Sequence, residues 1–166
     1  FSINKGELFR VCGANGSGKS IFLKCLINYH DNFKGKISQQ SGNNSLYIPQ
    51  ENFLFEGSIK DNMIKGIKSY NESELQYFIK LLKFDLPLEQ VVTPFIMNLS
   101  SGQLQKIKLI RALLYHPDIL LLDEIFSNIE DETIHSILNY ILLLQLNFLD
   151  KHLHILHKMS TNLLLS

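Results

Sequence analysis

Hydrophobic and polar residues along the chain fall into two kinds of segment. Short, largely apolar runs occur at residues 8–12, 46–48, 119–122 and 153–156. Runs of this length are typical of strands that are buried on both faces of a sheet. Longer segments place apolar residues three and four positions apart, which is the period of an amphipathic helix. This alternation predicts an α/β fold with a mostly parallel sheet.

Four helices are predicted. Along the chain they start near residue 21, at Asn71, at Ser100 or Ser101, and at the acidic stretch 130–132. Asn71 is followed three residues later by Glu74, as in a capped helix start, and the third helix runs to about Tyr115. Residues 32–44 are rich in turn formers, with one short strand expected at 35–38.

Length and charge narrow the possible classes of protein. The chain has 166 residues, and we expect residues 1–166 to form a single domain. It carries 16 Lys+Arg and 16 Asp+Glu, a balance that argues against nucleic acid as a partner. No apolar run reaches the roughly 20 residues needed to span a bilayer, so the domain itself is expected to be soluble. Cys12 and Cys25 lack metal-ligand spacing and are expected to be reduced core thiols.

Residues 13–20 fit the phosphate-binding pattern G-x-x-x-x-G-K-[ST], and we call them the phosphate loop. They are Gly13, Ala14, Asn15, Gly16, Ser17, Gly18, Lys19 and Ser20. The glycines let successive N–H groups point at phosphate oxygens, and the following helix presents its positive end to the same charge. Lys19 is expected to reach the β- and γ-phosphates, and Ser20 to hold Mg²⁺.

Two carboxylates follow the apolar run 119–122. The carboxyl ends of parallel strands face the ligand crevice of an α/β sheet, which places Asp123 and Glu124 there. Asp123 is suited to hold Mg²⁺ through water, and Glu124 to act as general base on the attacking water. The alternative is a pair of solvated acids that cap a strand. Gln50 follows another strand, which Pro49 stops, and can face the same metal.

Together with the phosphate loop, further stretches resemble the nucleotide-binding domain of ATP-binding-cassette (ABC) transporters over nearly the whole chain. They are YIPQ at 47–50, similar to the Q-loop; LSSGQ at 99–103, similar to the LSGGQ signature; 119–124, similar to Walker B; 127–130, similar to the D-loop; and 157–161, similar to the switch-histidine segment. The resemblance implies a P-loop NTPase core, with a mostly parallel sheet flanked by helices and a helical subdomain inserted at about 52–115.

The resemblance also implies roles for particular residues. It implies ATP as the substrate and Mg²⁺ as the cofactor. The implied catalytic residues are Lys19, Gln50, Glu124 and His157, and the implied Mg²⁺ contacts are Ser20, Gln50 and Asp123. The residues implied to bind ATP in trans, held by a second domain in a head-to-tail dimer, are Ser100, Ser101, Gly102 and Gln103. Serines at a helix start can instead serve only as N-caps. A three-histidine metal site of His152, His154 and His157 is disfavoured by the period of two along a strand.

The stretch 55–62 resembles a segment that follows the Q-loop of exporters. This implies export of a peptide, lipid or drug-like molecule through a transmembrane domain, in the same chain or in another subunit, at the cytoplasmic face of the cell membrane. The expected contact surface is formed by residues 50–62, in which Phe53 and Phe55 are expected to be exposed, and by the helix at about 72–83. The alternatives are a degenerate ATP-binding regulatory module and a non-transport ABC ATPase.

The chain departs from the family pattern at several places. Ser101 stands where the family usually has glycine, and Glu130 replaces the usual D-loop aspartate. Pro94 falls where exporters carry a glutamate before the signature. Because the chain opens on Phe1 rather than methionine, we expect it to be a piece of a longer protein. The resemblance places the aromatic residue that stacks on adenine upstream of Phe1, and the family's final strand and helices after the histidine segment.

Overall fold

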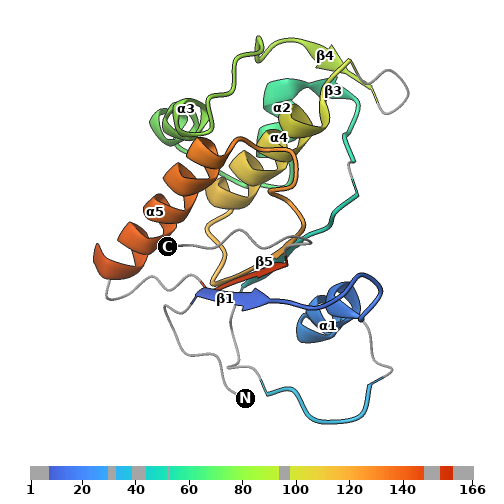
Figure 1. Ribbon diagram of the computed structural model, residues 1–166. Helices are drawn as coiled ribbons and strands as arrows, with labels where there is room; N and C mark the ends of the chain where they lie inside the picture. Colours follow the sequence, from blue (N-terminus) through green and yellow to red (C-terminus); the bar gives the residue numbers. More distant parts are fainter. Residues whose placement is uncertain are drawn as a thin grey trace. The chain divides into compact units, whose positions relative to one another are not determined.

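The computed structural model describes residues 8–29, 33–38, 44–51, 53–93, 98–147 and 154–158. The chain divides into two compact units, and Figure 1 labels most of their helices and strands. The second unit comprises Glu51–His116 and Asn128–Leu143, and the first contains Pro117–Ser127 together with the residues up to Gln50 and those from Leu144 onward. The expectation of a single domain with a helical subdomain inserted at about 52–115 stays a prediction.

A parallel sheet forms the first unit. Its strand order is β1 (Leu8–Val11), β6 (His154–Lys158), β5 (Ile119–Asp123) and β2 (Ser45–Ile48), and every neighbouring pair is parallel. Helix α1 (Lys19–Leu26) packs on the sheet through Leu23, which is fully buried with Leu121 of β5. The apolar runs therefore become strands of one sheet, of which β5 is buried from Leu120 to Asp123. The α/β fold with a parallel sheet is confirmed.

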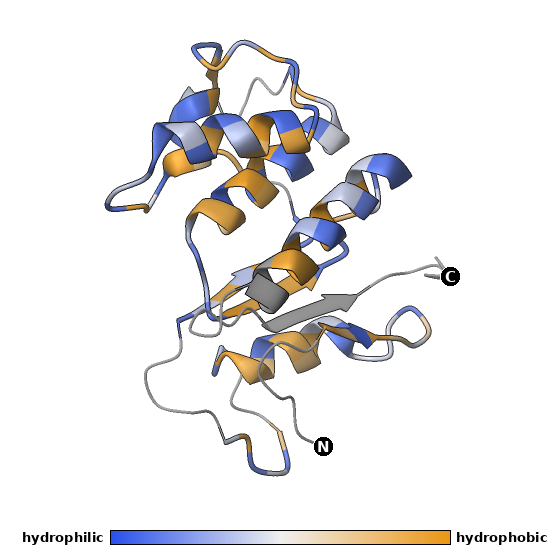
Figure 2. Cartoon of the chain, turned by 90° about the vertical axis from the view of Figure 1, so that its left-hand side faces the viewer, coloured by the Kyte–Doolittle hydropathy of each residue, from blue (hydrophilic) through white to orange (hydrophobic). Residues whose placement is uncertain are grey.

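The second unit is mainly helical. Its helices are α2 (Ile59–Ile64), α3 (Glu72–Leu81), α4 (Ser101–Leu114) and α5 (Asp131–Asn147), the last belonging to this unit as far as Leu143. Two short strands, β3 (Gly57–Ser58) and β4 (Val91–Val92), pair antiparallel. Fully buried side chains from α2, α3 and α4 form the core, among them Ile59, Met63, Leu75, Phe78, Ile107 and Ile110. Each helix carries both hydrophobic and hydrophilic residues (Figure 2), as the helical period predicts.

The predicted helix caps are present. The side chain of Asn71 accepts a hydrogen bond of 2.8 Å from the N–H of Ser73 at the start of α3. Oε2 of Glu74, in the same first turn, lies 3.1 Å from Nε2 of His116. Of the two serines proposed to cap α4, Ser100 is the cap and Ser101 is the first helical residue.

Several details differ from the sequence-based expectations. Residues 33–38, which the structure describes, contain no strand, and Gly35 has a φ of +134° that interrupts an extended run. Cys12 is exposed rather than in the core, because β1 ends at Val11 and the loop begins there. Strand β6 continues through His157 instead of ending before it. None of the helices that the structure describes has the length and apolar character to cross a membrane.

Candidate nucleotide-binding site

The phosphate loop joins β1 to α1 by the tight backbone path that its glycines allow. Gly16 and Gly18 have φ values of +78° and +89°, in the left-handed region that glycine enters without a steric penalty. The N–H of Ser17 donates to the carbonyl oxygen of Ala14 at 3.2 Å and closes the turn. Gly18 is then the N-cap of α1, so the first N–H groups and the positive end of this helix border the loop.

Lys19 is held inside this loop. Its side chain is only 6% exposed, and its Nζ donates to the carbonyl oxygens of Gly13 and Ala14 at 2.8 Å each. A buried ammonium is costly unless such acceptors surround it. The loop therefore fixes one positive charge beside the backbone N–H groups, and Ser20, which is half-buried, follows in the first turn of α1.

Asp123 is the last residue of β5 and is 2% exposed. Its Oδ2 accepts a hydrogen bond of 2.8 Å from the hydroxyl of Tyr47 in β2. Sequence reasoning gave Tyr47 no role, because the contact depends on the pairing of β2 with β5, and no local pattern reveals that pairing. The buried carboxylate is thus held by a phenol from the neighbouring strand.

Glu124 marks the point where the chain leaves the sheet. Its φ is +54°, in the left-handed region, which costs a residue with a side chain about 1–3 kcal/mol. The N–H and the hydroxyl of Ser127 both donate to the backbone carbonyl oxygen of Glu124, at 3.4 and 3.1 Å, and hold the turn. Strained backbone of this kind is concentrated at functional sites. The side chain is partly exposed, so water has access to the carboxylate.

The parallel sheet places the remaining predicted residues at one edge. Gln50 follows the end of β2 and is exposed, and His157 lies near the end of β6. The backbone of His157 is in register with Arg10 of β1 and Leu122 of β5. Because parallel strands share one carboxyl edge, the phosphate loop, Asp123, Gln50 and His157 belong to the same edge of the first unit.

Magnesium fits the oxygen donors at this edge. The hydroxyl of Ser20, the carboxylate of Asp123 and the amide oxygen of Gln50 are hard ligands of the kind that Mg²⁺ prefers beside phosphate. Among the described residues no group of three or more His, Cys, Asp or Glu side chains forms a metal site of its own. The alternative site of His152, His154 and His157 lies outside the side chains that the structure describes.

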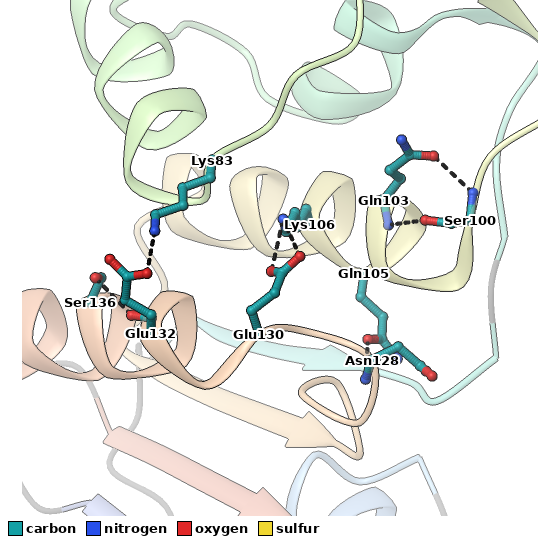
Figure 3. Close-up of polar contacts among 9 residues, drawn as sticks. All are labelled: Lys83, Ser100, Gln103, Gln105, Lys106, Asn128, Glu130, Glu132 and Ser136. Carbon is teal, nitrogen blue, oxygen red and sulfur yellow. Dashed lines mark hydrogen bonds and ion pairs between the residues drawn. The ribbon is translucent and has the colours of Figure 1, made fainter.

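The signature segment, residues 99–103, lies in the second unit. Ser100 Oγ accepts from the N–H of Gln103 at 3.1 Å, and Gln103 Oε1 accepts from the N–H of Ser100 at 2.8 Å (Figure 3). This reciprocal capping box satisfies two N–H groups of α4. The cap uses one lone pair of the Ser100 hydroxyl as acceptor. The hydroxyl proton therefore remains available to donate to phosphate. Ser101, the departure from glycine, is exposed.

Residues 127–130 are similar to the D-loop and are called the D-loop segment here. From Asn128 onward this segment belongs to the second unit, where it contacts α4 (Figure 3). The N–H of Asn128 donates to Gln105 Oε1 at 3.0 Å, and Lys106 Nζ forms an ion pair with Glu130 at 3.0 Å. The pKa of Glu130 is lowered by a hydrogen bond from its own backbone N–H and by Lys106. Glu130, the second departure, therefore has a partner that sequence reasoning missed.

Fold and site together define a P-loop nucleotide-binding domain. A solved structure of a bacterial Atm1-family ABC exporter with ATP bound has the same fold, with a TM-score of 0.76 at 23% identity, over 93% of this chain and 30% of that one. The family model described as ABC transporter matches residues 1–127. The chain belongs to the ABC transporter family, whose ATP-binding domains are ATPases.

Curated relatives agree with this assignment. The chain is 34% identical to a lactococcin transport/processing ATP-binding protein, LcnC-like, of Lactococcus lactis, over 86% of this chain and 23% of the relative. It is 31% identical to a probable multidrug resistance ABC transporter ATP-binding/permease protein, YheI, of Bacillus subtilis, over 85% of this chain and 27% of the relative. The chain thus spans about a quarter of the length of these relatives.

Proposed function

We propose that the chain binds and hydrolyses ATP and thereby powers an exporter at the cytoplasmic face of the cell membrane. The observation that carries the proposal is the shared carboxyl edge of the sheet, where β1 leads into the phosphate loop and β5 ends at Asp123, followed by Glu124. The names of the relatives, a lactococcin transporter and a multidrug transporter, support a peptide or drug-like substrate.

Each residue at this edge has a distinct task in the proposed reaction. The loop N–H groups and Lys19 bind the phosphates, and Ser20, Asp123 and Gln50 hold Mg²⁺, which when bound neutralises phosphate charge. Glu124 accepts a proton from the attacking water. His157 donates a hydrogen bond to the γ-phosphate.

A second nucleotide-binding domain completes the proposed site. The residues that would bind its ATP in trans are Ser100, Ser101, Gly102 and Gln103. The free hydroxyl proton of Ser100 and the positive end of α4 support this role, since both attract phosphate. The expected arrangement is a head-to-tail dimer, in which each phosphate loop faces the other domain's signature segment.

Replacing Lys19 tests nucleotide binding. Lys19→Ala removes the buried ammonium, so calorimetry with Mg-ATP should show a loss of at least about tenfold in affinity. Lys34→Ala is the matched control, because Lys34 is an exposed lysine of the first unit. Equal affinity in the unmodified chain and the Lys19 variant would refute the phosphate-site assignment.

Replacing Glu124 tests hydrolysis separately from binding. Glu124→Gln keeps the shape of the side chain but removes the proton acceptor, so turnover should fall about 10²- to 10⁴-fold while ATP still binds. Size exclusion with Mg-ATP should then show a trapped dimer. ATP binding without hydrolysis by the unmodified chain would favour the regulatory-module alternative.

The surface around Phe53 is the proposed contact with the transmembrane region. Phe53 is 60% exposed. Phe55, by contrast, is half-buried, because its ring packs edge-on against Phe53 and lies 5.0 Å from Lys65 Nζ and 5.6 Å from the Arg111 guanidinium. A cysteine at position 53, rather than 55, should therefore cross-link to the cytoplasmic loops of the transporter. A cysteine at exposed Tyr29 in the first unit provides the control.

A further inference from the structure

The ring of Tyr47 and the carboxylate of Asp123 lie on the same face of the sheet. Tyr47 of β2 is in register with Leu121 of β5, and Asp123 is two residues further along β5. Side chains two apart on a strand share a face, so Leu121 and Asp123 both face α1. Tyr47 packs against the cluster of Leu23 and Leu121 on that face.

The packing of the ring determines where the hydroxyl lies. The core cluster fixes the rigid ring of Tyr47, and its hydroxyl ends 2.8 Å from Asp123 Oδ2. Because Asp123 is 2% exposed, bulk water competes little for this oxygen. A hydrogen bond from a neutral hydroxyl to a carboxylate is stronger than one between neutral groups and restricts rotation of the carboxylate.

We infer that Tyr47 is a positioning residue for the metal, and that its hydroxyl orients the Asp123 carboxylate toward the Mg²⁺ of the bound nucleotide. The inference rests on the proposed function. Tyr47 acts through Asp123 and does not itself touch nucleotide or metal. Outer partners of metal-binding carboxylates typically change metal affinity about 10- to 100-fold when they are removed.

Tyr47→Phe separates this role from packing, because it keeps the ring in the core and removes only the hydroxyl. The matched control is Tyr29→Phe, which removes a hydroxyl from an exposed tyrosine in the same unit. Binding of Mn²⁺ to the full chain in the presence of ADP, followed by electron paramagnetic resonance, reports on the metal without requiring turnover. We expect Tyr47→Phe to weaken Mn²⁺ binding about tenfold. ADP affinity without metal should stay unchanged, and so should Mn²⁺ binding by Tyr29→Phe.

A double-mutant cycle with Asp123→Asn tests the pathway of the effect. If Tyr47 acts through Asp123, the loss caused by Tyr47→Phe should largely disappear in the Asp123→Asn background. Equal losses in both backgrounds, or unchanged Mn²⁺ affinity in Tyr47→Phe, would overturn the inference. Failure of the proposed function looks different, because then Lys19→Ala would not change ADP-dependent Mn²⁺ binding, or the unmodified chain would show none.

Discussion

The backbone carbonyl oxygen of Asn128 lies against the Cα of Gly102, where a Cβ atom would be only 2.5 Å away. The glycine of the signature segment therefore has a steric role within its own unit, because it admits the D-loop backbone to the first turn of α4. The hydrogen bond from Asn128 N–H to Gln105 Oε1 lies beside this contact (Figure 3). The signature segment and the D-loop segment are thus packed directly against each other.

The first prediction concerns this close contact. Gly102→Ala forces a methyl group against a backbone oxygen, so it should lower the free energy of unfolding by about 1–3 kcal/mol. Urea denaturation measures the change. Ser101→Ala, at the exposed neighbouring position, should stay within about 0.5 kcal/mol of the unmodified chain. A Gly102→Ala variant as stable as the unmodified chain would show that the backbones do not approach so closely.

The second prediction concerns the ion pair between Lys106 and Glu130. The lysine side chain is 10% exposed and the glutamate side chain 67% exposed, so the two partners are not equivalent. Glu130→Gln leaves a buried ammonium without its anion and should destabilise the protein by roughly 1 kcal/mol. Lys106→Met removes the buried charge itself and should cost less. Chemical denaturation of both variants measures the two losses of stability. A larger loss for Lys106→Met than for Glu130→Gln would contradict this account.

The third prediction concerns the backbone at Glu124. Because φ is +54° there, glycine should fit better than alanine, and Glu124→Gly should be more stable than Glu124→Ala by about 1 kcal/mol. Both variants lack the carboxylate, so both should lose ATP hydrolysis. Thermal denaturation and a phosphate-release assay on the same samples separate backbone strain from chemistry. Equal stability would mean that residue 124 adopts an ordinary conformation.

The fourth prediction concerns Tyr140 of α5, whose ring centroid lies 5.3 Å from that of Phe78. Burial, and then the nearby Glu74 and Tyr77, raise the pKa of Tyr140 to about 12. The folded state therefore binds this proton more tightly than the unfolded chain, whose tyrosine pKa is near 10. Its contribution to stability is complete below about pH 10 and declines as the pH rises toward 12.

The measurement compares the unmodified chain with Tyr140→Phe, which keeps the ring but cannot ionise. Stability determined by denaturant titration between pH 8 and about pH 11 should fall more steeply in the unmodified chain than in the variant. The difference in free energy of unfolding between the unmodified chain and Tyr140→Phe at pH 7 serves as the reference. Parallel curves would indicate that Tyr140 titrates alike in the folded and unfolded states.

Local features were predictable from the sequence because neighbouring residues alone produce them. The phosphate loop needs only glycines at the turn positions and a helix directly after it, and all of these lie within residues 13–26. The caps at Asn71 and Ser100 likewise bond to N–H groups two or three residues further on. Asp123 and Glu124 could be placed at a strand end because an uninterrupted apolar run precedes them. The two-residue strands β3 and β4 are too short to show any period.

Contacts between distant segments were decided by the tertiary structure. Tyr47 and Asp123 are 76 residues apart, and they meet only because β2 pairs with β5 in one particular register. Lys106 and Glu130 are 24 residues apart and meet because the D-loop segment packs on α4. Strand register and helix packing result from burial of apolar surface summed over many residues, which no short motif encodes. The sequence by itself therefore determined which chemical groups the site contains, and packing determined which side chains hold them in position.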